Sequence, residues 1–152
     1  MIWTPVGEGK KVKHTYAGTV LPPLYERLGG VNSIATVVDA FVDGLLADPA
    51  VAGNMRVAES MKKTSPAALK YLVTELTCMV TGGPQKYSGK SMKDSHKDLG
   101  ITEAEWNAMA KDFVATLTKF NVPAHEQGEL LTIVGTTKAD VVTVPTMSTM
   151  RK

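Results

Sequence analysis

Apolar residues at helical spacing are the feature that most constrains the fold of this chain. Four segments repeat large apolar side chains every three or four positions, which is the spacing of one buried helix face. They run from Ile34 to Leu45, from Leu69 to Val80, from Trp106 to Phe120 and from Leu130 to Val134. No segment alternates apolar and polar residues for long enough to predict a strand. The sequence therefore predicts an all-α fold.

Capping residues and helix breakers predict where the first two helices lie. Residues 24–28 (LYERL) predict a short helix that a pair of glycines, Gly29 and Gly30, stops. Asn32 or Ser33 is then expected to cap the second helix, because both side chains accept hydrogen bonds from free backbone N–H groups. That helix should end near residues 48–49 (Asp-Pro).

Similar signals mark the rest of the chain. Residues 53–65 are polar without a helical pattern and are expected to be irregular, after which Ser65 caps a helix with proline at its first position. Residues 84–90 are expected to form a loop, and Thr102 with Glu105 has the spacing of a capping box. Residues 122–123 (Val-Pro) separate the last two helices. We expect residues 1–23 to be an N-terminal extension, 24–142 a single domain and 143–152 a loose tail.

Composition excludes several classes of function. The net charge of +2 is too small to indicate a nucleic-acid partner. Cys78 is the only cysteine, so neither an internal disulfide nor a covalently attached c-type haem is expected. No apolar run reaches signal-peptide or membrane-spanning length, so we expect no membrane insertion. The compartment is undetermined, with the cytoplasm as the default.

The stretch GGPQKYSGKSMKDSHKDLG, residues 82–100, allows two interpretations. Its Gly-Lys-Ser resembles a phosphate loop, but five residues lie between Gly83 and Gly89 where that motif has four. Pro84 also lacks a backbone N–H, and the preceding segment has helical rather than strand spacing. The sequence therefore does not predict a nucleotide site.

The second interpretation concerns His96. If residues 91–99 are a short helix, His96 shares one face with Met92 and Leu99. A neutral imidazole there could bind haem iron if its other ring nitrogen donated to a backbone carbonyl one turn back. A core histidine whose ring nitrogens find hydrogen-bond partners within the protein fits the spacing as well. Periodicity alone favours this core histidine over a haem ligand.

The order of the motifs resembles that of the group I truncated hemoglobins. The matching residues are 24–30 (LYERLGG), Phe41, 46–49 (LADP), 82–84 (GGP), Tyr87, Gly89, Met92, His96, Ile101 and 122–123 (VP). The resemblance covers residues 24 to about 142. It implies a truncated globin-like two-on-two helical sandwich around non-covalent haem b, with His96 as the proximal iron ligand and the metal-binding residue.

The sequence departs from this family on the distal side. Relatives usually carry a tyrosine directly after the phenylalanine of the second helix, where it donates to the bound ligand, but here Val42 follows Phe41. Met55 stands where relatives place a phenylalanine on the haem edge. The distal helix offers aliphatic residues where many relatives are polar: Leu69, Leu72 and Val73. Losing a donor removes roughly 1–3 kcal/mol of oxygen stabilisation, so we expect weak oxygen binding and no nitric oxide dioxygenase activity.

The resemblance and the helical phase imply further haem contacts. The side chains expected on the porphyrin faces are Phe41, Met92, Leu99, Ile101, Trp106 and Met109. Lys86, Tyr87 and Lys90 lie in the loop where relatives approach the haem propionates, and a lysine can pair with a carboxylate there. Each of the three fits a solvated residue equally well.

Three functional hypotheses follow. The first is a haem protein that reversibly binds a small diatomic gas (O2, CO or NO) and is not an enzyme. The second is a haem electron-transfer or peroxidase-like protein that docks to a larger redox enzyme through residues 1–23, with His14, Met55 or Met61 as a sixth iron ligand. The third is a structural or interaction subunit on a globin scaffold, against which the retained His96 argues.

Overall fold

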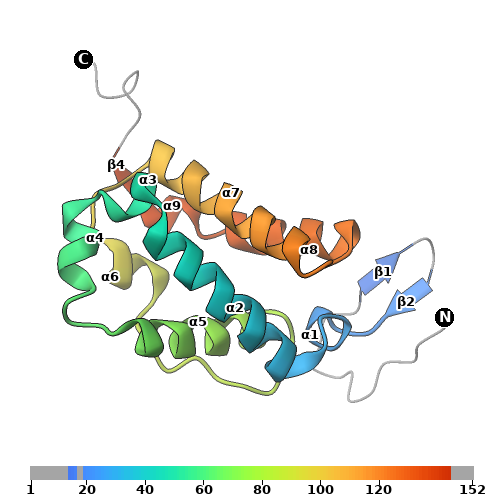
Figure 1. The fold of residues 1–152 in the computed structure, drawn as a ribbon. Helices are drawn as coiled ribbons and strands as arrows, with labels where there is room; N and C mark the ends of the chain where they lie inside the picture. The colour runs from blue at the N-terminus through green and yellow to red at the C-terminus, as the bar shows by residue number, and fades with distance from the viewer. Residues whose placement is uncertain (1–13, 17–18, 145–152) are drawn as a thin grey trace.

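The computed structural model describes residues 14–16 and 19–144, and most of this length is helical (Figure 1). The helices are α1 (Leu24–Arg27), α2 (Gly30–Ala47), α3 (Pro49–Ala52), α4 (Met55–Ser60), α5 (Pro66–Val80), α6 (Met92–His96), α7 (Glu103–Lys119), α8 (Ala124–Gly135) and α9 (Lys138–Val141). The strands are β1 (His14–Tyr16), β2 (Thr19–Leu21), β3 (Ile101–Thr102) and β4 (Val142–Val144).

The long helices form two layers. α2 crosses the middle of the molecule and packs against α5 on one side and α7 on the other, while α8 packs against α7 and α1 (Figure 1). The short helices α3 and α4 link α2 to α5, and α6 packs against α9. The prediction of an all-α, two-on-two helical sandwich is confirmed.

Two small sheets are present that the sequence did not predict. β1 and β2 pair antiparallel with His14 opposite Leu21, and β3 pairs parallel with β4 through Ile101 and Val142. Their strands have two or three residues, which is too short for an alternating pattern to be visible. Because β4 includes residues 143–144, the predicted loose tail cannot begin at 143. Residues 145–152, and most of the predicted N-terminal extension, lie outside the described part.

Several predicted helix ends are confirmed. α2 ends at Ala47, and the hydroxyl of Ser65 accepts from the backbone N–H of Ala68 to cap α5. Thr102 and Glu105 form both hydrogen bonds of the capping box at the start of α7. These caps were predictable because each depends on residues at most three positions apart.

Two predictions about helices are wrong. Neither Asn32 nor Ser33 caps α2, which begins at Gly30 after Gly29; both glycines have positive φ, +98° and +82°, and allow the chain to turn directly into the helix. Residues 53–65 are not irregular throughout, because α4 forms at residues 55–60. Its N-cap is Asn54, whose side-chain oxygen accepts from the N–H groups of the next turn.

Most of the buried apolar side chains in the described part of the chain form three separate clusters. The α2–α5 cluster contains Ile34, Val38, Val42 and Cys78. The α1–α7–α8 cluster contains Leu24, Leu117 and Leu130. The α7–α9 cluster contains Ile101, Trp106 and Val141. Cys78 is fully buried, whereas Met79 and Val80 lie outside the core with 42% and 43% exposure.

α2 has the length and apolar composition of a membrane-spanning helix, with a mean hydropathy of 1.4 over 18 residues. The expectation that no stretch reaches this length is therefore wrong by that criterion. Central helices of globular folds meet the same criterion. α2 packs between α5 and α7, and its Asp39 and Asp43 both pair with Lys70 of α5, at 2.7 and 2.8 Å.

Candidate functional site

His96 is the last residue of the short helix α6, and its ring has a defined orientation. Its Nδ1 lies 2.9 Å from the carbonyl oxygen of Met92, one turn back, as the sequence predicted, and 2.9 Å from the hydroxyl of Ser95. Because a carbonyl only accepts, Nδ1 carries the proton and Nε2 keeps its lone pair. Within the described residues nothing forms a hydrogen bond with Nε2. His96 is therefore fixed in the tautomer that a metal ligand needs.

Local contacts hold α6 at both ends. The hydroxyl of Ser91 caps it by accepting from the N–H of Asp94 at 3.0 Å. After the helix, the carbonyl of Leu99 accepts from the side-chain amide of Asn54 at 3.0 Å, and Gly100 turns the chain with φ +62°. Lys97, directly after the helix, is exposed. The ring position therefore depends on contacts on both sides of the helix.

The residues predicted on the histidine side gather in one place. Ile101 and Trp106, both 8% exposed, belong to the α7–α9 cluster. The half-buried residues packed against it include Met92, Leu99 and Met109. Five of the six residues predicted on the porphyrin faces thus gather around this cluster, and the sixth, Phe41, does not.

The residues predicted on the opposite side gather around the α2–α5 cluster. Phe41, Leu69 and Val73 are half-buried and pack against it, and the Phe41 ring meets Phe113 of α7 edge-on, with centroids 5.1 Å apart. Val42 is only 1% exposed. Protein atoms cover it almost completely, so Val42 belongs to the packed core and does not line an open pocket.

Leu72 differs from the other predicted distal residues. It is half-buried, yet among the described residues it belongs to none of the three clusters, and the same holds for Leu76 one turn later. Sequence analysis placed Leu76 on the apolar face of this helix but not at the site. Its i+4 spacing from Leu72 was the available signal.

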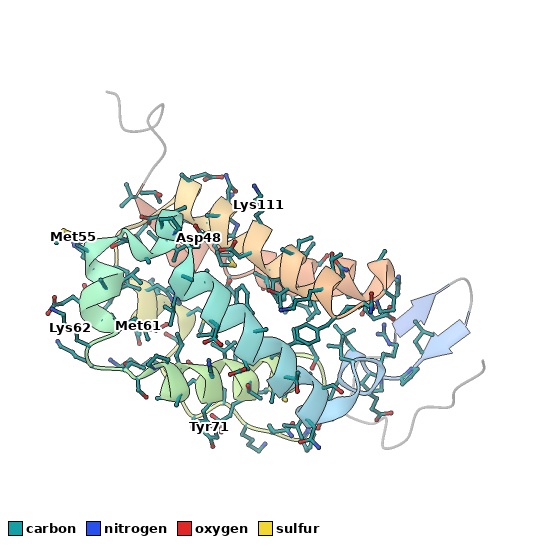
Figure 2. The ribbon with its side chains drawn as sticks, viewed as in Figure 1. Asp48, Met55, Met61, Lys62, Tyr71 and Lys111 are labelled. Atoms are coloured by element: carbon teal, nitrogen blue, oxygen red, sulfur yellow. The ribbon has the colours of Figure 1, made fainter. Side chains whose placement is uncertain are left out.

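The structure places the three candidates for a sixth iron ligand, Met55, Met61 and His14, to different extents. Met55 is 83% exposed and projects from the outer end of α4, because Asn54 sets the start of that helix (Figure 2). The prediction that Met55 lines the pocket is therefore wrong. Met61 is half-buried at the end of α4. The side chain of His14 lies outside the described part of the structure.

The loop residues predicted near the propionates have mixed roles. The hydroxyl of Tyr87 donates to the carbonyl of Lys90 at 2.6 Å, so Tyr87 stabilises the loop itself. Burial first, then the charge of Glu75, raise the pKa of this tyrosine. Lys86 and Lys90 are exposed and have no ion pair with any described residue. Their ammonium groups are available for an anionic partner.

A second group of possible metal ligands lies at the far end of the molecule. Donor atoms of His125, Glu126 and Glu129 lie within 4.8 Å of one another. The guanidinium of Arg27, however, contacts Glu126 at 2.9 Å and Glu129 at 2.7 Å. Both carboxylates thus already bind a cation, which would repel a metal ion. Burial lowers the pKa of Arg27, but the hydrogen bonds and charges of the two carboxylates outweigh burial and raise it. This group joins α1 to α8.

The described residues fit a haem in two respects. The α2–α5 cluster and the α7–α9 cluster are separate, although one domain usually has one continuous core. Between them the large side chains that face the site stay half-buried, as expected for a core completed by a flat apolar group. His96 supplies an imidazole whose Nδ1 donates to the Met92 carbonyl, and imidazole is the usual protein ligand of haem iron.

Two surface hollows lie elsewhere among the described residues. One of about 470 Å³ lies between the outer faces of α2 and α5, and one of about 330 Å³ lies beside Gly100. His96 lines neither. The candidate site is therefore defined by the histidine and the two apolar clusters, and not by an open surface hollow.

Comparison with known proteins identifies the class. The profile of the family described as bacterial-like globin matches residues 23–143. This match and the two-on-two arrangement make the protein a haem-binding globin. A group 1 truncated hemoglobin from Synechocystis is 30% identical over 118 residues, covering 74% of this chain and 89% of that protein. One from Tetrahymena pyriformis is 29% identical over 119 residues, covering 78% and 93%. The chain belongs to the group 1 truncated hemoglobins.

Solved structures agree with this assignment. The 2/2 hemoglobin from Synechococcus, in the cyanomet state with covalently attached haem, is 32% identical with a TM-score of 0.67, covering 79% of this chain and 98% of that one. The Fe(III) truncated hemoglobin from Tetrahymena pyriformis is 28% identical with a TM-score of 0.67, covering 78% and 97%. Globins of this kind bind small gaseous ligands.

Proposed function

We propose that this globin holds haem b non-covalently through His96 and reversibly binds a small diatomic gas. The observation that carries the proposal is the hydrogen bond from Nδ1 of His96 to the Met92 carbonyl, at 2.9 Å. It fixes the tautomer and orients the ring. When bound, haem iron supplies a coordination position for the gas. We take residues 24–142 to be the unit that does this.

Apolar residues on both sides keep water from the site. On the histidine side these are Met92, Leu99 and Met109, and on the other side Phe41, Leu69 and Leu72. A flat apolar cofactor between them would bury surface that the protein alone leaves half-exposed, which stabilises the complex at roughly 25 cal/mol per Å². Lys86 and Lys90 are the residues we assign to the propionates.

We propose weak stabilisation of oxygen. The predicted distal residues Val42, Leu69, Leu72 and Val73 carry no hydrogen-bond donor. Val42 is also covered by protein, so its position offers no room for a water molecule that could act as a donor. Losing one donor to a partly charged ligand costs roughly 1–3 kcal/mol, and CO is affected less because it is less polarised.

We propose that the haem is not bonded to the chain through sulfur. A thioether needs a thiol, and the only one, on Cys78, is 0% exposed; burial also raises its pKa. The Synechococcus protein differs in carrying covalently attached haem. Extraction of the haem into acidified organic solvent tests this point. We also expect α2 to stay within the fold rather than in a bilayer.

Optical spectra of the haem-loaded protein test the proposed function. We expect a five-coordinate ferrous form that binds CO rapidly. A six-coordinate ferrous form lost on removing residues 1–23 would instead support the redox hypothesis, with His14 as sixth ligand and this segment as the docking site for a partner. Six-coordination that persists would direct attention to Met61. No haem uptake would rule out both functions.

Substitution of the two described histidines makes the test specific. His96→Ala should abolish stable haem uptake or leave the haem labile. His125→Ala is the matched control, because His125 lies at the other end of the molecule, 2.8 Å from Glu129. If the spectra of His96→Ala equal those of the wild type, His96 is not the ligand.

A further inference from the structure

The helix that carries His96 has little packing of its own. α6 has five residues, too few to be stable alone. Its main neighbour is α9, a helix of four residues. The position of His96 must therefore depend on the segments that enter and leave α6. The segment that leaves α6 is held by Asn54, which donates to the Leu99 carbonyl. The segment that enters α6 is residues 81–91.

Residues 81–91 run back along the outer side of α5 (Figure 1). The N–H of Gly83 donates to the carbonyl of Cys78 at 2.8 Å, and the N–H of Tyr87 to the sulfur of Met79 at 3.5 Å. Further along, both the N–H and the hydroxyl of Ser88 donate to Oε1 of Glu75, at 3.1 and 2.6 Å. One carboxylate oxygen on α5 thus receives two hydrogen bonds from one loop residue.

Glu75 lies on a different face of α5 from the apolar site residues. Tyr71, Glu75 and Met79 are spaced by four and share the outer face, and Tyr71 is seen on the side of α5 turned away from α2 (Figure 2). Leu72 and Leu76, each one position later, are half-buried. The hydrogen bonds from Ser88 hold the pKa of the Glu75 carboxyl below its usual value, so it is charged at neutral pH.

Between Ser88 and His96 several local hydrogen bonds hold the chain. The Tyr87 hydroxyl donates to the carbonyl of Lys90 at 2.6 Å and fixes the three residues before α6. The Ser91 hydroxyl caps α6, and Nδ1 of His96 donates to the carbonyl of Met92, the first residue of α6. Among the described contacts, the bonds between Ser88 and Glu75 are the last between α5 and this segment before α6 begins.

We propose that Glu75 is a positioning residue for His96, holding residues 87–91 on α5 through Ser88 and thereby fixing the placement of α6. The inference rests on the proposed function, because it takes His96 to be the axial ligand. It also gives α5 a second role. Leu72 lies on the inner face of α5, and Glu75 on its outer face binds the segment that leads to His96. A shift of α5 on ligand binding would therefore displace both sides of the site.

The test uses the haem-loaded protein and two signals that report on the histidine. One is the iron–histidine stretching band of the ferrous form by resonance Raman, and the other is the rate of haem transfer to excess apomyoglobin. Glu75→Ala and Ser88→Ala should each shift or broaden the band. Each should also speed haem release about three- to tenfold, which is what loss of a hydrogen bond of ordinary net strength produces.

Three further variants separate positioning from general loosening. Glu75→Gln keeps an acceptor oxygen for Ser88 and should restore most of the wild-type band. Glu75→Ala removes both hydrogen bonds from Ser88, whereas Ser88→Ala removes only the one from its hydroxyl, so the double variant should behave like Glu75→Ala alone. Glu59→Ala removes an exposed carboxylate of α4 that pairs only weakly with Lys62, at 3.4 Å, and should change nothing.

The outcomes distinguish this inference from the proposed function. If His96→Ala abolishes the iron–histidine band while Glu75→Ala leaves both the band and the haem release rate unchanged, the positioning role of Glu75 is wrong and the ligand assignment stands. If the band survives in His96→Ala, the proposed function itself fails. Far-UV circular dichroism of every variant identifies any that fails to fold. If Glu75→Ala fails to fold, Ser88→Ala decides whether the positioning role is correct, since it alters an exposed side chain.

Discussion

Leu72 is the distal residue at which a single side chain should change ligand preference. It is half-buried and outside the three described clusters, so a replacement there does not disrupt the packed core as one at Val42 would. Leu72→Gln adds an amide N–H of similar reach. We expect oxygen to dissociate about tenfold more slowly, as one added hydrogen bond to a partly charged ligand produces, while CO changes less. Stopped-flow measurement of both rates checks this.

Leu72→Met is the control for Leu72→Gln, because methionine matches the length of glutamine without a donor. It should leave the ratio of the oxygen and CO dissociation rates near that of the wild type. If Leu72→Gln slows both gases by the same factor, the amide acts by obstructing the path and not by hydrogen bonding.

A pair of carboxyl groups makes stability depend on pH. Asp48 follows α2 and accepts from the N–H of Ala50 at 2.9 Å, and Asp112 of α7 also bonds with it; Figure 2 labels Asp48 and the neighbouring Lys111. Oδ2 of Asp112 is covered and has no described donor. Burial, and then the interaction with Asp48, raise the pKa of Asp112 to about 6, although Lys111 opposes this rise. The hydrogen bond with Asp112 lowers the pKa of Asp48. Below a pH of about 6, a proton on Asp112 therefore joins α7 to the α2–α3 corner through Asp48.

The sign of the pH effect follows from the raised pKa of Asp112. Below about 6 the folded protein keeps a proton that the unfolded chain, with an ordinary value of 3.8, releases. The stability due to Asp112 should thus be present near pH 4 and fall as the pH rises to 6. Asp112→Asn donates to Asp48 without a titrating proton, so it should remove this fall. At pH 7 it should gain on the order of 0.5 kcal/mol, a small effect because the residue is partly exposed.

Urea unfolding of the haem-loaded protein between pH 4.5 and 7.5 measures this effect. Asp98→Asn, at an exposed position beyond α6, is the control and should follow the wild type. The role of the Asp112 proton would be wrong if Asp112→Asn kept the wild-type pH profile.

At the level of elements, the start of α7 should be the most sensitive helix end. Oε1 of Glu105 accepts from the backbone N–H of Thr102 and from the side chain of Asn54, both at 3.0 Å, while the Thr102 hydroxyl accepts from the N–H of Glu105 at 3.1 Å. Thr102→Ala should cost about 1 kcal/mol of unfolding free energy. Chemical denaturation measures it, and Thr102→Ser should recover most of the loss. Equal loss in both variants would show that the hydroxyl is not the cause.

The same helix ends show what the sequence allowed us to predict. Ser65 and Thr102 could be identified as caps because their partners lie three residues away. The start of α2 could not, because the N–H of Val31 is satisfied by the hydroxyl of Tyr25, outside the helix, at 3.1 Å. α4 was missed because its residues lack a buried face; Asn54 was the available signal.

Site residues follow the same rule. The His96 geometry was predictable because it needs only the phase of one helical turn. Met55 was misplaced because its direction depends on how α4 is rotated. That rotation is set by Asn54 through Leu99 and Glu105, which lie 45 and 51 residues further along the chain. No local pattern encodes such a contact. The role of Glu75 likewise depends on a fold-level contact, with Ser88 thirteen residues away.

For the whole molecule, the separation of the clusters predicts which parts need the cofactor. The α1–α7–α8 cluster is closed by protein alone and reinforced by Arg27, whose guanidinium meets Glu126 and Glu129. The α2–α5 cluster has fully buried residues, Val42 and Cys78, at its centre. The α7–α9 cluster has none below 7% exposure, and it supports the short helices α6 and α9. It should therefore be the part most dependent on haem.

Removing the haem should loosen α6 and α9 before the rest of the protein. Because a ligand stabilises only the state that binds it, haem at 1,000 times its dissociation constant should add about 4 kcal/mol to the unfolding free energy. Hydrogen exchange locates the change: amides of residues 92–96 and 138–141 should lose protection in the haem-free protein, while those of α2 and α8 keep it. His125→Ala, loaded and unloaded, provides the reference. Uniform loss of protection across α2, α6 and α8 would mean that the clusters form one cooperative core, and that the gap between them is not where haem contributes its stability.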